Sequence, residues 1–156
     1  MLFRSIAGKA PRVVASVLGS TWPKEESDMG LSEYCANQAY ELAGIGPQEL
    51  DLVELHDASA LAEIQAYENL GLCAEGEGGA HVRSGASRLG GRQPVNTSGG
   101  LLRKGHPIGA TGIAQIVELA QQLSGRSGPR QVDGARLCLA HNAGGSLGTE
   151  IGRAHV

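Results

Sequence analysis

The run from Asn96 to Gly112 restricts the fold of this chain more than any other segment. Glycines recur along it, at positions 99, 100, 105, 109 and 112, and a single histidine, His106, lies among them. Glycine accepts a positive φ and lets another group approach the backbone closely, so this spacing predicts a tight turn. Pro107 follows the histidine, with a fixed φ that suits the first position of a helix. We therefore expect a glycine-rich turn that opens a helix.

The helix expected after this turn has the clearest apolar pattern in the chain, and Gly125 ends it. Its apolar residues recur at the spacing of a helix face that packs on a core, and they are Ile113, Ile116, Val117, Ala120 and Leu123. His106 would then lie at the N-terminus of this helix. Unpaired backbone N–H groups and the helix dipole favour an anion or a developing oxyanion at that end.

Strand-like and helix-like segments alternate along the rest of the chain. Strands are expected at 12–18, 50–55 and 135–140, with a short one at 94–96, and helices at 31–43 and 60–70. Asp57 or Ser59 is the expected N-cap of the second helix. Residues 73–93 are rich in glycine and charge, which predicts an irregular excursion or a loose hairpin. The alternation predicts an α/β fold with reacting groups at strand ends, where His56, His106 and His141 lie.

Length and composition exclude several classes of protein. A chain of 156 residues fits one domain, and a formal net charge of −3 without a basic cluster disfavours nucleic acid and anionic membranes as partners. No apolar run approaches the roughly 20 residues of a spanning helix, so we expect a cytoplasmic protein with no membrane span. Cys35, Cys73 and Cys138 form no Cys-x-x-Cys pair, which predicts reduced, packed thiols and no metal site.

The glycine-rich run resembles the thiolase signature. It matches at Asn96, Gly99, Gly100, Gly105, His106, Pro107, Gly109, Thr111 and Gly112, while Arg103 stands where the family usually has Ser or Ala. A second segment, Val53 to Ser59, is similar to the His-Asp-Cys-Phe loop of the sterol-carrier-protein type of thiolase. The similarity extends from about Arg12 to about Gly148.

This resemblance implies a thiolase-like C-terminal domain, with a mixed five-stranded sheet, helices on both faces and a last strand that this chain has lost. We expect the domain at 11–149, after an N-terminal remnant at 1–10 and before a non-native tail at 150–156. The resemblance also assigns roles. His106 would activate a nucleophilic cysteine, His56 would orient a water or bind the thioester oxygen, and His141 would stand where other thiolases have a second catalytic cysteine.

The remaining site residues follow from the same resemblance. The expected substrate-binding residues are Asn96, Gly99, Gly100, Gly105, Asn142 and Gly144, with Asp57 and Pro107 in supporting roles. Coenzyme A would be substrate or product, and no covalently bound cofactor or metal is expected. Ala58 stands where the sterol-carrier type has its proton-shuttling cysteine, and the family's nucleophile lies in an N-terminal domain that nothing in this chain matches.

The leading hypothesis is therefore the C-terminal half of a thiolase-like acyltransferase that makes or breaks a carbon–carbon bond in acyl-CoA thioesters. We expect the isolated chain to be inactive, and its partners to be the missing N-terminal domain, a second copy bound through that domain, and a small acyl-CoA-binding protein. Two alternatives remain. One is a retro-aldolase of a bulky acyl-CoA, which loss of the shuttle cysteine favours, and for which Tyr67 is a candidate acid. The other is a non-catalytic acyl-CoA-binding or structural subunit.

Overall fold

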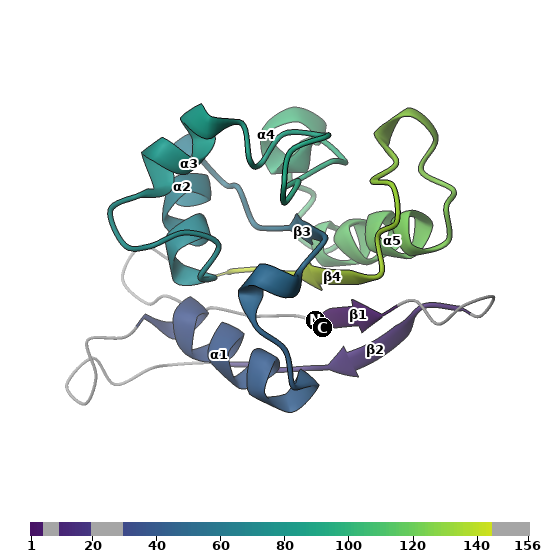
Figure 1. Cartoon of the computed structure of the whole chain (residues 1–156), viewed down its shortest axis with the longest axis horizontal. Helices are drawn as coiled ribbons and strands as arrows, with labels where there is room; N and C mark the ends of the chain where they lie inside the picture. Colours follow the sequence, from purple (N-terminus) through teal and green to yellow (C-terminus); the bar gives the residue numbers. More distant parts are fainter. Residues whose placement is uncertain (5–9, 20–29, 145–156) are drawn as a thin grey trace.

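A mixed four-stranded sheet forms the centre of the fold in a computed structural model that describes residues 1–4, 10–19 and 30–144 (Figure 1). The strands are β1 (Leu2–Arg4), β2 (Arg12–Ala15), β3 (Leu52–Glu54) and β4 (Leu137–Ala140). Their order is β2-β1-β4-β3, with β1 antiparallel to both neighbours and β3 parallel to β4. Val95, in the middle of the short strand predicted at 94–96, forms an isolated parallel bridge to Val53. The predicted α/β class and mixed sheet are confirmed.

Only the N-terminal limit of the expected domain lies among the described residues. Within the segment expected to precede the domain, residues 2–4 form β1 in the interior of the sheet, where Leu2 and Phe3 are buried. The expected final strand and the expected tail at 150–156 lie outside the described residues. β2 is shorter than its predicted span of 12–18, and Val13 is 44% exposed because this strand lies at the sheet edge.

Five α-helices are present among the described residues. They are α1 (Leu31–Ala43), α2 (Ala60–Asn69), α3 (Gly78–Ser84), α4 (Gly100–Lys104) and α5 (Thr111–Leu123), with short 3-10 turns at Pro47–Glu49 and Gly128–Arg130. α1 ends at Gly44, whose left-handed φ of 65° closes the helix, and Ser59 Oγ caps α2 by accepting from Ala62 N at 3.1 Å. None of the helices in the described ranges is both long and apolar enough to cross a bilayer.

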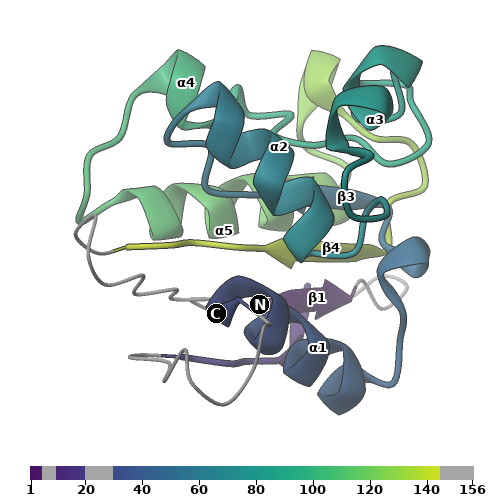
Figure 2. The ribbon, with the colours of Figure 1, turned by 90° about the vertical axis from the view of Figure 1, so that its left-hand side faces the viewer.

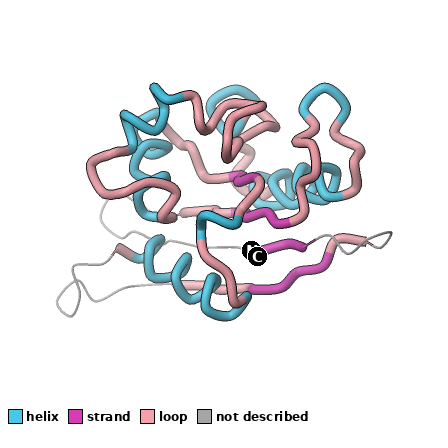
Figure 3. Tube along the Cα trace, viewed as in Figure 1, coloured by secondary structure: helices cyan, strands magenta, loops and turns pink. Residues whose placement is uncertain are grey.

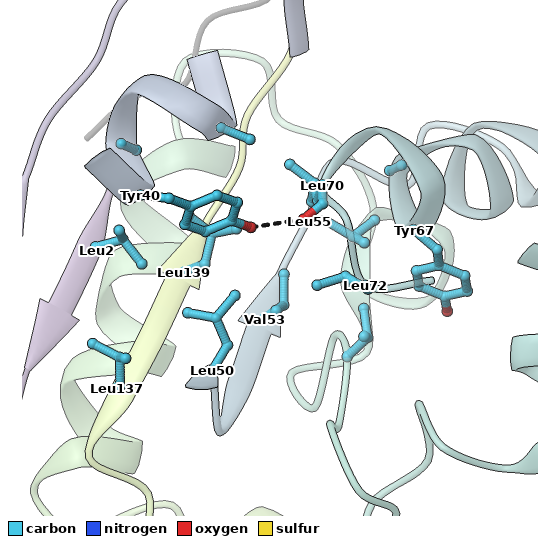
Figure 4. Close-up of a cluster of buried hydrophobic side chains, with 14 of the residues drawn as sticks. Leu2, Tyr40, Leu50, Val53, Leu55, Tyr67, Leu70, Leu72, Leu137 and Leu139 are labelled. Atoms are coloured by element: carbon cyan, nitrogen blue, oxygen red, sulfur yellow. Dashed lines mark hydrogen bonds between the residues drawn. The ribbon is translucent and has the colours of Figure 1, made fainter. Parts of the chain in front are cut away.

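The helices α1 and α2 pack on one face of the sheet and α5 on the other. Alternation along β4 shows this directly, because Leu137 and Leu139 join the cluster under α1 and α2 while Cys138 and Ala140 join the cluster under α5. Figure 2 shows α1 and α2 in front of the sheet. Figure 4 shows the first cluster, in which Tyr40 of α1 donates a hydrogen bond to the carbonyl of Leu70 at 2.7 Å.

The buried face of α5 differs from the predicted one. Ile113 is 63% and Val117 is 49% exposed, although both belong to the predicted apolar stripe. The buried positions are instead Thr111, Gln115, Glu118, Leu119, Gln122 and Leu123. The polar members of this face are hydrogen-bonded to neighbouring loops, so tertiary partners override the apolar pattern.

Residues 73–93 are more regular than predicted, because they contain α3. This helix starts with two glycines and ends at Gly85, so it lacks the apolar periodicity that would reveal it. Loops then lead from α3 to α4 and from α4 to α5 (Figure 3). Cys35 and Cys138 are buried, as predicted for packed thiols, and Cys73 is partly buried.

Candidate active site

The ends of β3 and β4 present polar side chains on the α5 side of the sheet. Leu52 of β3 packs under α5, so alternation directs Glu54 and then His56 to the same side. Cys138 and Ala140 of β4 also pack there, and Asn142 continues that series. β3 and β4 are parallel neighbours, so these residues meet at one sheet edge.

His56 and His106 form the centre of this edge. Their ring centroids lie 4.8 Å apart in an edge-to-face arrangement, with 88° between the ring planes. His56 Nδ1 lies 2.6 Å from Asn142 Oδ1, and His106 Nδ1 lies 2.7 Å from Thr111 Oγ1 in the first turn of α5. Two of the predicted site histidines and one predicted substrate-binding residue are thus brought together, while Thr111 is an addition.

The hydrogen-bond partners determine which ring nitrogen carries the proton. Asn142 Oδ1 only accepts, so His56 Nδ1 donates to it. The Thr111 hydroxyl donates to the Pro107 carbonyl at 3.2 Å, which leaves Thr111 Oγ1 to accept from His106 Nδ1. Both neutral imidazoles therefore carry a free lone pair on Nε2. The arrangement can accept a proton at either Nε2.

The environment keeps His56 neutral. Burial lowers the pKa of His56, the hydrogen bond with Asn142 opposes this effect, and the charge of a protonated His106 lowers the pKa further. Because the two rings are in contact, protonation of one disfavours protonation of the other. His106 itself is exposed, so its Nε2 is accessible to a reacting group from outside this domain.

His141 lies apart from this pair. Alternation along β4 turns it to the opposite side, where it is 6% exposed and its Nε2 lies 3.2 Å from Ser32 Oγ of α1. Burial lowers its pKa to about 3. Its Nδ1 is buried without a hydrogen-bond partner. The geometry places His141 behind the site, and its predicted catalytic role remains a prediction.

Asp57 attaches α4 to the end of β3. Its buried carboxylate accepts from Leu101 N at 2.7 Å and from Leu102 N at 3.3 Å, so it caps α4, while Ser59 caps α2. Gly100 is required here, because a Cβ at this position would collide with the Asp57 carboxylate. Asp57 therefore orients the loop that carries His106, and its supporting role in the reaction remains a prediction.

The remaining predicted substrate-binding residues shape the loop. Asn96 has a φ of 51°, and its Oδ1 accepts from Leu55 N at 2.8 Å, which ties the loop to the end of β3, while its buried Nδ2 has no partner. Gly99 and Gly105 have φ values of 100° and 85°. Gly144 is exposed at the end of the described range. Whether these residues contact a substrate remains a prediction.

Pro107 does not occupy the first helical position. Its carbonyl accepts from the N–H groups of Ala110 and Thr111, which forms a turn, and α5 begins only at Thr111. The predicted helix start at Pro107 was therefore wrong, because a separate turn precedes the helix. Within the described ranges, no group of three histidine, cysteine or acidic side chains could hold a metal ion.

Comparison with known proteins identifies the family of this domain. The family described as "Thiolase C-terminal domain-like" matches residues 25–152, which is most of the chain. The chain belongs to the thiolase family. Sterol carrier protein 2 of Rattus norvegicus is 44% identical to this thiolase domain over 147 residues, which cover 89% of the chain and 27% of that protein.

Two further relatives of this thiolase domain have enzyme names. Acetyl-CoA acetyltransferase of Methanothermobacter thermautotrophicus is 48% identical over 114 residues, covering 73% of the chain and 30% of that protein. Benzoylsuccinyl-CoA thiolase subunit BbsB of Thauera aromatica is 41% identical over 142 residues, covering 88% and 37%. The chain spans only 27% to 37% of these three relatives. The solved Ltp2-ChsH2(DUF35) aldolase shares the fold, with a TM-score of 0.74, 23% identity and coverage of 85% of this chain and 36% of that one.

The close approach at Gly100 leads to a stability prediction. Gly100→Ala is expected to lower the free energy of unfolding by about 2–4 kcal/mol, because a positive φ is strained for alanine and the methyl group would displace the Asp57 carboxylate. Gly44→Ala is the matched control, since Gly44 has a left-handed φ of 65° and no described residue lies within 4 Å of an added Cβ. We expect the control to lose only about 1 kcal/mol in urea unfolding. Equal losses would show that the contact with Asp57 does not matter.

Proposed function

We propose that this chain is the C-terminal half of a thiolase-like acyltransferase that acts on acyl-CoA thioesters, with His106 and His56 at the reacting centre. The observation that carries this proposal is the edge-to-face contact of the two imidazoles at 4.8 Å, with both Nε2 atoms free to accept a proton. The enzyme names of the relatives that match this segment support the same class of reaction.

His106 acts as the general base. Its accessible Nε2 accepts the proton of a cysteine thiol supplied by the other half of the enzyme, and the resulting thiolate attacks the thioester or ketone carbonyl. Thr111 and the Pro107 carbonyl hold the ring so that Nε2 points away from α5. His56 remains neutral beside it, and it accepts the hydrogen of a water or thiol at its own Nε2.

The exposed apolar residues of α5 supply a contact for the missing half. Ile113 is 63% and Val117 is 49% exposed, and Ile108, two residues after His106, is 83% exposed. Exposed aliphatic side chains grouped around a candidate site mark an interaction surface. The N-terminal thiolase domain would cover them and bring its cysteine to His106. A homodimer through that domain, and a small acyl-CoA-binding partner, belong to the same proposal.

Ala58 favours a second reaction within the same class of substrate. It is exposed directly after the His56-Asp57 pair and has no proton to exchange, whereas thiolysis needs a proton shuttle. Retro-aldol cleavage of a β-hydroxyacyl-CoA to a carbonyl compound and acetyl-CoA needs no second cysteine. It requires only removal of the hydroxyl proton and protonation of the enolate carbon.

A chimera distinguishes these reactions. In the acetyl-CoA acetyltransferase of M. thermautotrophicus, the matching segment is replaced by the matched 114 residues of this chain. We expect slow thiolysis that Ala58→Cys raises by about 10²-fold or more, because the side chain is exposed and the thiol restores proton transfer. Retro-aldol turnover without thiolysis would favour the second reaction. A folded chimera that binds acyl-CoA and catalyses neither reaction would overturn the proposed activity in favour of a non-catalytic subunit.

A further inference from the structure

Glu54 is a fully buried carboxylate directly behind the candidate site. It is the last residue of β3 and has 0% exposure. Its Oε1 accepts from Ser98 N at 3.0 Å, and its Oε2 accepts from Ser98 Oγ at 2.5 Å. The Glu54 carboxylate takes no part in the proposed proton transfer to His106 or in the contact between the His56 and His106 rings. Its partners lie in the segment that leads to His106.

The same carboxylate also reaches the other end of that segment. Lys104 Nζ lies 3.7 Å from Glu54 Oε2 and donates to Ser98 Oγ. Ser98 lies two residues before α4, and Lys104 is the last residue of α4, two positions before His106. One buried acid on a strand therefore holds both ends of the helical turn that precedes the candidate base.

Local charges agree with this arrangement. Burial raises the pKa of Glu54, and the charge of Glu118 raises it further, while the hydrogen bonds from Ser98 and the charge of Lys104 oppose the rise. A buried carboxylate without these partners would be strongly destabilising, so the fold gains by keeping Ser98 and Lys104 in place. The loop is thereby fixed to β3, the strand that carries His56.

Glu118 of α5 provides a matched comparison. It is 4% exposed and accepts from Arg130 Nη2 at 2.8 Å, from Gln122 Nε2 at 3.0 Å and from Thr97 Oγ1 at 3.1 Å. Its cation, Arg130, follows α5 rather than α4. Removal of the Arg130 charge should therefore disturb a buried carboxylate of similar burial without releasing Lys104.

We propose that Glu54 is a positioning residue that holds His106 against His56 by binding Ser98 and Lys104 at the two ends of α4. This role rests on the proposed function for its meaning, since it prepares the base for its reaction. The positioning role is tested, however, in the 156-residue chain without substrate. A failure of the chimera to turn over acyl-CoA would therefore leave the positioning role of Glu54 intact. Loss of the positioning role would likewise leave the proposed acyltransferase function intact.

Nuclear Overhauser contacts between the ring protons of His56 and His106 test the proposal in the full 156-residue chain. Glu54→Gln and Lys104→Met are each expected to reduce the intensity of this nuclear Overhauser contact at least twofold relative to the unmodified chain. Lys104→Arg keeps the positive charge, so the ring contact should keep the intensity of the unmodified chain. Arg130→Met is expected to lower stability in urea by a similar amount and to leave the ring contact unchanged.

Lys104→Met decides the question even if Glu54→Gln does not fold, because the Lys104 side chain is partly exposed, at 28%. An unchanged ring contact in a folded Lys104→Met chain would overturn the proposal. An equal weakening in Arg130→Met would do the same, since it would assign the effect to general loss of stability.

Discussion

Turnover of the chimera is expected to fall by about 10²–10⁴-fold when His106 is changed to Gln, because glutamine cannot accept the proton of a thiol. His106 is the exposed member of the imidazole pair, Thr111 binds its Nδ1, and no residue in the described ranges hydrogen-bonds its Nε2. Acyl-CoA binding should change little, since the loop is held by Asp57 and Glu54 rather than by the His106 ring. The loss should therefore appear in kcat, with KM within a few-fold of its starting value.

His81→Gln is the matched control for this experiment. His81 belongs to α3, is 8% exposed and packs against the ring of Tyr67 with centroids 5.2 Å apart, away from the His56–His106 contact. The same substitution there removes an imidazole without touching the candidate base. Steady-state kinetics of the two variants should differ by at least 10²-fold in kcat. Similar kcat values for both would remove His106 from the mechanism.

The sequence predicts the α1 and α2 helices well because their ends carry local signals. Gly44 supplies the left-handed residue that closes α1, and Ser59 supplies a side-chain oxygen that caps α2. These signals act within one turn of the chain. The stripe on α5 misleads for the opposite reason. Its buried face is decided by Thr97, Arg130 and other partners distant in sequence, which satisfy Glu118 and Gln122.

Only part of the candidate site could be predicted from the sequence. The motif identifies His56, His106 and Asn142, but it groups His141 with them, although alternation places His141 on the other side of the sheet. Two-residue periodicity along β4 could have separated the two, since Cys138, Ala140 and Asn142 share one face. The same two-residue periodicity could have identified Glu54, because this acidic residue lies on the face of β3 that His56 continues. Its partners Ser98 and Lys104 could not be identified in this way, because only the fold brings residues 44 and 50 positions apart together.

Tyr67 illustrates the value of the contacts around a candidate residue. Its hydroxyl donates to Glu63 Oε1 at 2.6 Å, its side chain is 2% exposed, and burial with the neighbouring Glu63 raises its pKa. A phenol in this state holds its proton and packs in the core under α2. These contacts favour its structural role over the role of an acid in aldol chemistry.

Stability of the chain is expected to fall steeply as the pH drops from 6.5 toward 3, and His141 is expected to account for much of the loss. Burial lowers the pKa of folded His141 to about 3, from an unfolded value near 6.5. Between these values the unfolded state binds a proton that the folded state excludes, so unfolding is favoured as the pH falls. Each pKa unit corresponds to about 1.4 kcal/mol, which gives a loss of the order of 5 kcal/mol across the window.

The change His141→Gln is expected to flatten this dependence, because glutamine can still reach Ser32 and does not titrate. Urea unfolding at pH 7, 5.5 and 4.5 measures the slope, and His106→Gln is the control, since it removes an exposed imidazole that lies apart from His141. The acid slope should persist in the control and decrease in His141→Gln. His56 and His81 also have lowered pKa values, so a residual slope of the same sign is expected. If His141→Gln retained the whole slope, His141 would not be the source of the acid dependence. The His141 ring would then be protonated in the folded chain, and the space between the sheet and α1 would have to open to water at mildly acidic pH.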